Sequence, residues 1–226
     1  MKLSVVMPVY DEVATIETAV RRVLENEFDK ELVIVDDGST DGTRQILQRL
    51  TDPRIKVYSH DRNRGKGACL QTALQHITGD IVVIQDADLE YRPRDYAQLI
   101  GPILDGDADV VYGSRFLGGP HRVLYIWHDL GNRVLTLIAN VLYNVNLSDI
   151  ETGYKAFSRR VLARVRFREP SFAFEVEFTA KVIKEGFRIF DTPISYAGRT
   201  YAEGKKIGWK DGVIALWGLL KYRFTD

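Results

Sequence analysis

The chain has 226 residues, of which 45% are hydrophobic and 27% are charged, a balance typical of one globular domain with a sizeable core. Lys+Arg and Asp+Glu both number 31, so net charge gives no support to nucleic-acid binding, and electrostatic recognition must come from local clusters. The single cysteine, Cys69, cannot form an internal disulfide and excludes a Cys-rich zinc site.

Neither a targeting segment nor a membrane span is predicted. Residues 1–8 contain an apolar run too short for a signal peptide, and we interpret them as a first strand. The most apolar late segment, Val213–Leu220, is far shorter than the ~20 residues that a span needs. We therefore expect a cytoplasmic protein that can rest on a membrane surface without crossing it.

Residues 1–113 alternate short β-branched runs with stretches of helical periodicity, the pattern of βαβ units. The expected strands are Leu3–Pro8, Leu32–Asp36, Ile55–Ser59, Ile81–Gln85 and Val110–Gly113. Apolar spacing predicts helices at Ala14–Asn26, Thr43–Leu50, Gly67–Ile77 and Pro93–Ile100. Asp41 can cap the second helix, and Pro93 suits the first turn of the fourth. The predicted fold class is α/β, with a Rossmann-like, mainly parallel central sheet flanked by helices.

After Gly113 the regular strand signal fades, and one long helix is predicted over Leu124–Asn144. No linker, repeat or low-complexity tract divides the chain. We interpret residues 1–226 as a single domain with two functional halves, 1–113 and an α-rich half at 114–226.

Acidic residues follow the fourth predicted strand. Ligands of open parallel sheets bind beyond the carboxyl ends of the strands, so Asp86 and Asp88 can jointly face a divalent ion that bridges a diphosphate, with Glu90 as a third oxygen donor. Hard oxygen ligands favour Mg²⁺ or Mn²⁺. A solvated acidic turn is the alternative interpretation.

Two further segments have the chemistry of a nucleotide site. Asp36 and Asp37 follow the second strand, where one of them can accept hydrogen bonds from a base or ribose, although ordinary turn chemistry also uses such residues. Residues 64–67, Arg-Gly-Lys-Gly, open a helix whose free N–H groups and Lys66 suit a diphosphate. They lack the P-loop pattern, and a loop without phosphate contact is equally compatible.

Five motifs run in order along the chain: Val6–Glu12, Val35–Thr43, Asn63–Gly67, Gln85–Glu90 and Gly113–Arg115. With them the sequence resembles glycosyltransferase family 2 with the GT-A fold, and within it the dolichol-phosphate mannosyltransferase-like branch that makes polyprenyl-phosphate sugars. The resemblance implies a nucleotide-sugar half at 1–113, an acceptor half at 114–226 and an Mg²⁺ or Mn²⁺ cofactor.

The resemblance also implies a role for each matching residue. The nucleotide sugar would be bound by Pro8, Tyr10, Glu12, Asp36, Lys66 and Asp86. The metal would be bound by Asp86, Asp88 and Glu90, although family members often have Gln at the last position. Asp88, Asp149 and Arg115 are the expected catalytic residues, with Asp149 orienting the donor sugar or the arginines, or acting only as a structural cap or ion pair.

Four motifs of the second half resemble the acceptor side of that branch: Asn132–Arg133, Asp149–Lys155, Phe174–Glu177 and Arg199–Lys206. By this resemblance the lipid phosphate would be held by Arg115, Arg133, Arg199 and Lys206, because guanidinium groups bind phosphate oxygens bidentately and lysine adds a point charge. Lys205 stands where the branch commonly has Ser. Solvated surface groups are the alternative for each basic residue, and Glu175 and Glu177 either position basic residues or begin a helix.

The segment Trp209–Phe224 combines Trp, Tyr, aliphatic and basic residues in the manner of an interfacial helix. It would let the enzyme meet a lipid-borne phosphate at a membrane surface. The alternative is a helix that packs on the protein's own core, on a membrane-protein partner or on a second copy of the chain.

Together these features predict an inverting transfer of a hexose from a nucleotide sugar, GDP-mannose in preference to a UDP-sugar, to dolichyl or undecaprenyl phosphate. An ionised phosphate acceptor needs positioning more than a general base. Two alternatives stay open. One is a soluble family 2 enzyme acting on a glycan hydroxyl, with Asp149 as the base, and the other is an inactive module that binds a nucleotide sugar or a lipid phosphate.

Overall fold

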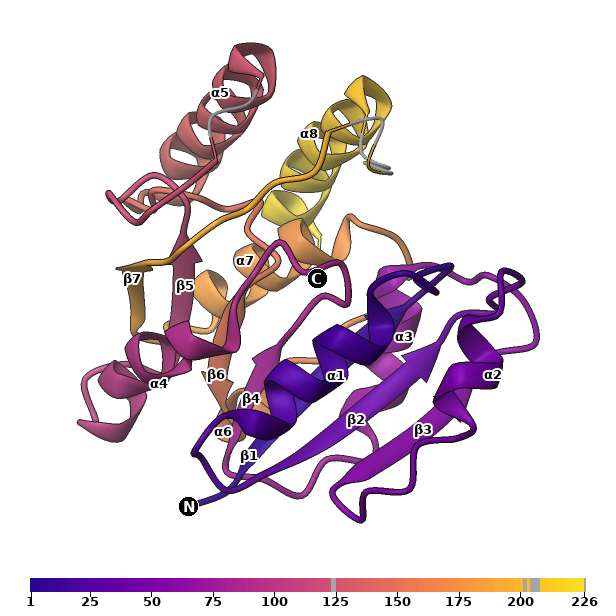
Figure 1. Ribbon diagram of the computed structural model, residues 1–226. Coiled ribbons are helices and arrows are strands. Elements are labelled where there is room, and N and C mark those ends of the chain that lie inside the picture. Colours follow the sequence, from indigo (N-terminus) through magenta and orange to yellow (C-terminus); the bar gives the residue numbers. More distant parts are fainter. Residues whose placement is uncertain (123–124, 201–202, 204–207, 226) are drawn as a thin grey trace.

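The computed structural model describes residues 1–122, 125–200, 203 and 208–225, with only the backbone of Trp209 and Lys210. Seven strands form one sheet in the order β3-β2-β1-β4-β6-β5-β7. Their bounds are Leu3–Val9 (β1), Lys30–Asp36 (β2), Ile55–Ser59 (β3), Ile81–Ile84 (β4), Val110–Ser114 (β5), Lys155–Ser158 (β6) and Ile189–Pro193 (β7). All neighbouring pairs are parallel except those of β6 with β4 and β5. The expected mainly parallel sheet flanked by helices is confirmed (Figure 1).

The helices of the first half are those that the periodicity predicts, with ends that differ by a few residues. They are α1 (Ile16–Glu25), α2 (Thr43–Leu47), α3 (Lys66–Leu74) and α4 (Tyr96–Leu104), the last preceded by a 3₁₀ turn, η1 (Pro93–Asp95). Pro93 is the first residue of that turn, as expected. The Asp41 carboxylate accepts a hydrogen bond from the backbone N–H of Thr43 at 3.0 Å, which satisfies one free donor at the start of α2.

The second half contains α5 (Ile126–Tyr143), α6 (Arg160–Arg164), α7 (Phe174–Lys184) and α8 (Trp209–Phe224). It also contributes β6 and β7 to the central sheet, where we expected an α-rich half in which the regular strand signal fades. The four residues of β6 are Lys-Ala-Phe-Ser and are all buried. They lack the β-branched run that signals a strand, so pairing with β4 and β5 decides their conformation. The sheet therefore crosses the boundary at residue 113.

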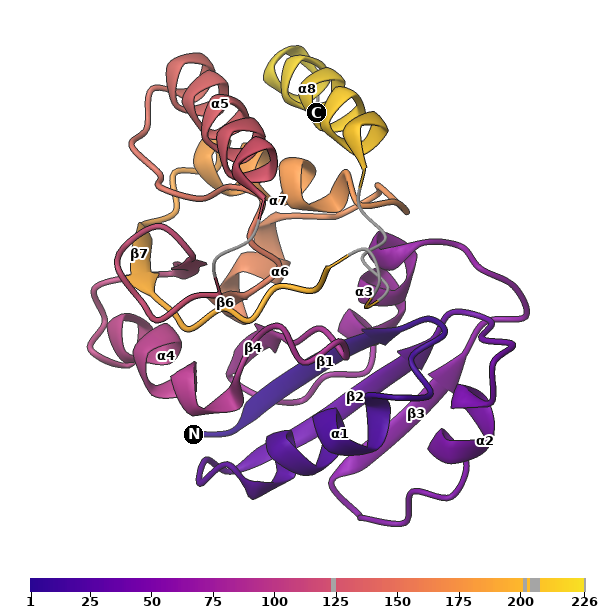
Figure 2. The ribbon, with the colours of Figure 1, turned by 45° about the horizontal axis from the view of Figure 1, so that its top comes forward.

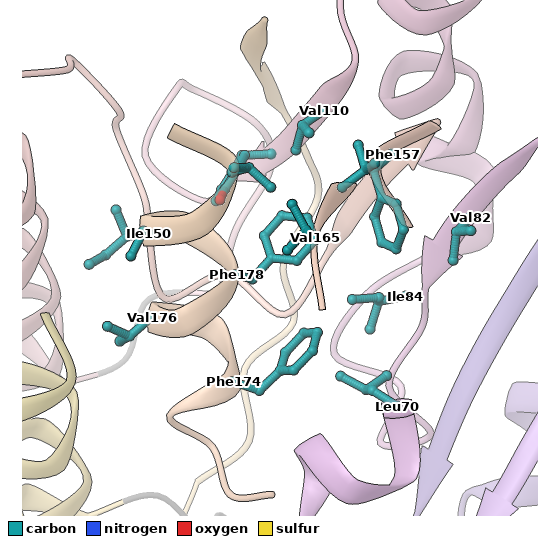
Figure 3. Packing of buried hydrophobic residues seen from close by; sticks show 14 of the residues in the cluster. Leu70, Val82, Ile84, Val110, Ile150, Phe157, Val165, Phe174, Val176 and Phe178 are labelled. Carbon is teal, nitrogen blue, oxygen red and sulfur yellow. The ribbon is translucent and has the colours of Figure 1, made fainter. Parts of the chain in front are cut away.

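Apolar side chains cover both faces of the sheet, as a parallel sheet requires. Leu3, Val5 and Met7 of β1 belong to the cluster that packs under α1 and α4, and Val6 belongs to the cluster on the other face. On that second face Figure 3 shows Phe174 and Phe178 of α7 near Phe157 of β6, with Leu70 of α3 close by. The Phe157 and Phe178 ring centroids are 5.3 Å apart. Helix α7 of the second half thus packs on strands of both halves.

Helices α5 and α8 lie side by side on one side of the molecule, next to α7 and far from α1 and α2 (Figures 1 and 2). The hydroxyl of Tyr143 in α5 donates a hydrogen bond to the carbonyl of Leu219 in α8 at 2.8 Å. Within the part of the chain that the structure describes, no helix is both long and apolar enough to cross a membrane.

Candidate active site

A cavity of about 320 Å³ lies beyond the carboxyl ends of β1 and β4. The first half lines it with residues 8–10 and 12, Asp37, Asn63, the start of α3, and residues 86–88, 90 and 91. The second half lines it with residues of α5, α7 and α8 and with residues outside these helices, among them Arg115, Glu151, Tyr196 and Arg199. This is the edge of an open α/β sheet at which ligands bind.

Most of the predicted site residues meet in this cavity. Those that line it are Pro8, Tyr10, Glu12, Lys66, Asp86, Asp88, Glu90, Arg115 and Arg199. The family resemblance assigns some of these residues to the donor and others to the acceptor. They are neighbours in the structure, although Pro8 and Arg199, for example, are 191 positions apart in the sequence.

Three predicted residues are placed differently, and a fourth lies outside the described residues. Asp36 is fully buried outside the cavity lining, because its carboxylate binds the Arg44 guanidinium at 2.7 Å, and its neighbour Asp37 lines the cavity instead. Arg133 lies on α5 with a side chain 57% exposed and pairs with Asp129, one turn earlier, at 2.7 Å. Asp149 reaches the cavity only through Arg115, and Lys206 lies outside the described residues.

The acidic residues after β4 crowd negative charge at one wall of the cavity. Asp86 lies 2.9 Å from the ammonium of Lys66, and Asp88 lies 2.9 Å from the guanidinium of Arg199. Burial raises the pKa of Asp88 to about 7, and the charges of Asp86 and Glu90 act in the same direction. A divalent cation would relieve this repulsion through the hard oxygen donors that it prefers, so Asp86 and Asp88 fit the implied metal.

Glu90 is engaged elsewhere. One of its carboxylate oxygens accepts the backbone N–H of Arg199 at 2.8 Å, and the other accepts the hydroxyl of Tyr196 at 2.9 Å. The oxygens of Asp86, Asp88 and Glu90 do not converge within 4.8 Å of one another in the described structure. The role of Glu90 as a metal ligand stays a prediction, and the role that its contacts show is to hold residues 196–199.

Lys66 stands at the centre of an ion-pair network that joins the two halves. Its ammonium lies 2.9 Å from Asp86 and 3.1 Å from Glu175, and Glu175 also pairs with the fully buried Lys155. Burial lowers the pKa of Lys66, but the charges of Asp86 and Glu175 outweigh burial and raise it above its usual value. Lys66 therefore stays charged. The sequence does not indicate that Lys155 is buried, because a single lysine within a motif is usually a surface residue.

Arg115 is held by a buried carboxylate. Its guanidinium contacts both oxygens of Asp149 at 2.7 Å, and its backbone N–H donates to the same carboxylate at 3.2 Å. The guanidinium carbon also lies 5.3 Å from the centre of the Tyr196 ring. Asp149 is thus a positioning residue that fixes Arg115 as a cation on the cavity wall.

Glu151 also lines the cavity, although the sequence motifs assign it no role. One of its carboxylate oxygens is buried and has no hydrogen-bond partner among the described residues. Burial raises the pKa of Glu151 to about 7. It lies two residues after Asp149, and only its place inside a recognised motif could have drawn attention to it.

Asp37, His60 and Cys69 also gather close together, with one ligand-type atom each within 4.8 Å of the others. The Asp37 carboxylate already binds His60 at 2.7 Å and accepts the backbone N–H groups of Arg64 and Gly65. These bonds hold the loop that opens α3, so we assign the group a structural role. Burial raises the pKa of the Cys69 thiol.

Comparison with known proteins decides the family. Residues 4–166 match the family model for glycosyl transferase family 2. The chain belongs to this family. Among relatives, the family 2 chain is 30% identical over 210 residues to the glycosyltransferase AglD of Haloferax volcanii, a match that covers 87% of this chain and 33% of that protein. It is 29% identical over 217 residues to the polyprenol monophosphomannose synthase of Mycolicibacterium smegmatis, covering 90% of this chain and 80% of that protein.

The fold is that of the GT-A enzymes. A crystal structure of glucosyl-3-phosphoglycerate synthase from Mycobacterium tuberculosis, in complex with Mn²⁺, UDP and phosphoglyceric acid, matches with a TM-score of 0.76. The match has 22% sequence identity and covers 100% of this chain and 79% of that one. The family 2 chain spans about a third of AglD, so activity, substrates and partners are matters of proposal.

Proposed function

We propose that the chain is an inverting, metal-dependent glycosyltransferase that transfers a hexose from a nucleotide sugar to a polyprenyl phosphate, dolichyl or undecaprenyl. The observation that carries the proposal is one cavity in which donor-type carboxylates face Arg115, beside two helices with exposed apolar faces. GDP-mannose is favoured over a UDP-sugar, in keeping with the motifs and with the mannose and polyprenol in the name of the M. smegmatis relative.

On the donor side, Asp86 and Asp88 would hold Mg²⁺ or Mn²⁺, and Lys66 stands at the first residue of α3, where a helix has free N–H groups that favour a diphosphate. The metal, when bound, would stabilise the negative charge of the departing nucleoside diphosphate. Pro8, Tyr10 and the neighbouring residues supply the wall for the nucleoside.

On the acceptor side, Arg115 offers a guanidinium already oriented by Asp149. A phosphate oxygen is ionised near neutral pH, so it can attack the anomeric carbon once it is positioned, and no base is needed. Arg199 and Lys206 stay candidates for the same phosphate. Arg133 stacks on Phe116, with its guanidinium carbon 4.6 Å from the ring centre, and would act at the rim of the site.

Helices α5 and α8 supply a surface for a lipid. Large apolar side chains are exposed on both, above all Ile126, Trp127, Val141, Trp217 and Phe224, which are 68% to 82% exposed. Both helices also line the cavity, so the apolar faces continue from its walls. Apolar patches of this kind mark membrane or protein interfaces, and the Trp, aliphatic and basic residues of α8 suit the membrane interface. We propose that the enzyme is peripheral, resting on the membrane with these two helices.

A second candidate function is favoured by Glu151. A buried carboxyl with an unpaired oxygen in the cavity and a pKa of about 7 has the properties of a general base. Such a base would serve a family 2 enzyme that acts on a glycan hydroxyl. Glu151 suits this role better than Asp149, whose two oxygens are both occupied by Arg115.

The deciding experiment supplies radiolabelled nucleotide sugars, Mg²⁺ or Mn²⁺ and a polyprenyl phosphate in detergent, and measures label extracted into organic solvent. We expect metal-dependent transfer that Asp88→Asn lowers by at least ~100-fold, because charge stabilisation of the leaving group is lost. Asp105→Asn, at an exposed carboxylate after α4, is the matched control and should retain activity.

Other outcomes would identify the alternatives. Labelling of a water-soluble glycan, abolished by Glu151→Gln, would overturn the lipid acceptor and support the second candidate. Nucleotide binding with no transfer to any acceptor would indicate an inactive binding module.

A further inference from the structure

The guanidinium of Arg199 lies against the acidic wall of the cavity, which is formed by Glu12, Asp88 and Glu90. Its guanidinium lies 2.9 Å from Asp88, 3.3 Å from Glu12 and 3.6 Å from Glu90, and its side chain is only 17% exposed. By the motifs, these carboxylates belong to the metal and the nucleotide, whereas Arg199 belongs to the acceptor phosphate. In the structure, Arg199 forms ion pairs with these carboxylates.

The backbone around Arg199 is fastened separately from its side chain. Glu90 accepts the N–H of Arg199 at 2.8 Å and the hydroxyl of Tyr196 at 2.9 Å, and the Glu90 carbonyl accepts the N–H of Ala197 at 3.0 Å. The guanidinium can therefore change partners while residues 196–199 stay in place. One N–H of that guanidinium, Nε, is buried without a hydrogen-bond partner among the described residues, so its present position leaves it incompletely satisfied.

A metal ion and this guanidinium compete for Oδ2 of Asp88, because Oδ1 already accepts the backbone N–H of Glu90 at 3.1 Å. A cation held by Asp88 would lie within a few ångströms of the guanidinium, which is itself 2.9 Å from that carboxylate. Two cations at that separation repel strongly in a partly buried site. A metal bound at Oδ2 of Asp88 would therefore weaken the pairing of Arg199 with this carboxylate.

We propose that Arg199 is an internal counter-ion of the metal site, which the metal-bound donor displaces and which then turns to the acceptor phosphate. Before the donor arrives, it holds Asp88 and Glu12 in place and compensates their charge. After displacement, it supplies a free cation on the acceptor side. Binding is thus ordered, with metal and donor ahead of acceptor. This inference rests on the proposed function for the metal-bound donor at Asp86 and Asp88 and for the acceptor phosphate.

The first test measures Mn²⁺ binding to the nucleotide-free protein by electron paramagnetic resonance of free Mn²⁺. We expect Arg199→Gln to bind Mn²⁺ at least ~10-fold more tightly than the wild type, because its competitor is gone, and Arg199→Lys to stay close to the wild type. Arg92→Gln removes an exposed cation two residues after Glu90 and controls for long-range charge, with an expected change below ~2-fold. Arg199→Gln binding no tighter than Arg92→Gln would overturn the proposal.

The second test measures binding of farnesyl phosphate with and without Mn²⁺ and GDP. We expect Mn²⁺ and GDP together to tighten farnesyl phosphate binding in the wild type and to have no such effect in Arg199→Gln, since coupling between sites is reciprocal. Tightening that persists in Arg199→Gln would contradict the exchange. Neither test requires turnover, so failure of the transfer assay and failure of this inference are distinguishable.

Discussion

Asp149 has no exposed surface, and its two carboxylate oxygens both contact the guanidinium of Arg115. Replacing Asp149 with Asn would leave a buried guanidinium without its counter-charge, so we expect the free energy of unfolding to fall by about 3–5 kcal/mol. Urea denaturation measures the change. Asp129→Asn is the control, because its pair with Arg133 is exposed on α5 and should contribute less than ~0.5 kcal/mol. Equal losses in the two variants would contradict the buried pair.

Glu151 predicts a pH dependence of stability. Burial raises its pKa from 4.5 to about 7, so the folded state binds the proton more tightly than the unfolded state does. Stability contributed by the protonated form is therefore present below pH 4.5 and is lost as the pH rises towards 7. We expect Glu151→Gln to gain stability relative to the wild type across this window. Urea midpoints at several pH values test it, and a difference that does not change with pH would refute it.

At the scale of elements, the start of α3 is shaped by the loop before α7. A Cβ at Gly67 would lie 2.0 Å from the carbonyl oxygen of Glu169, and the N–H of Ala68 donates to the carbonyl of Pro170. We expect Gly67→Ala to destabilise the protein by about 1–3 kcal/mol, as overpacking does. Gly131→Ala in α5 meets no atom within 4 Å and should instead stabilise the protein by about 0.5–1 kcal/mol. Thermal unfolding compares the two; the same sign in both would contradict this packing.

The apolar faces of α5 and α8 predict binding to lipid vesicles. Trp217 is 68% exposed on α8, and we expect Trp217→Glu to weaken cosedimentation with anionic vesicles by at least ~10-fold. Val57→Glu, on β3 far from these helices, should leave vesicle binding unchanged. If vesicle binding is absent and light scattering shows that Trp217→Glu dissociates an oligomer, the apolar faces of α5 and α8 form an interface with a second copy of the chain.

The sequence predicts a helix or strand well when local apolar periodicity specifies it, and poorly when pairing with other strands does. The strands and helices of residues 1–113 follow from local periodicity, because each buries a regular apolar face. In β6, only Ala156 and Phe157 are apolar, between Lys155 and Ser158. The strand forms because it pairs with β4 on one side and with β5 on the other. Its lysine is tolerated in the interior because Glu175 pairs with it.

For the whole molecule, the sheet order argues that the two halves unfold together. Strand β6 of the second half lies between β4 and β5 of the first, and β7 pairs with β5. We therefore propose a single domain over residues 1–226 and expect one cooperative transition in urea, with superimposable curves from tryptophan fluorescence and far-UV circular dichroism. Tryptophan reports on the second half, which contains all three Trp residues. Two separate transitions would indicate that residues 1–113 and 114–226 unfold as independent domains.

The sequence by itself determined the fold class, the family and the chemical types at the site, because ordered motifs at strand ends are local features of the chain. Only the tertiary structure decided which of these residues meet. In the tertiary structure, Asp36 pairs with Arg44, Lys66 pairs with Glu175, Asp149 pairs with Arg115, and Arg199 pairs with Asp88. These pairings depend on burial and, except for that of Asp36 with Arg44, on contacts between residues far apart in the sequence, and no single segment encodes either.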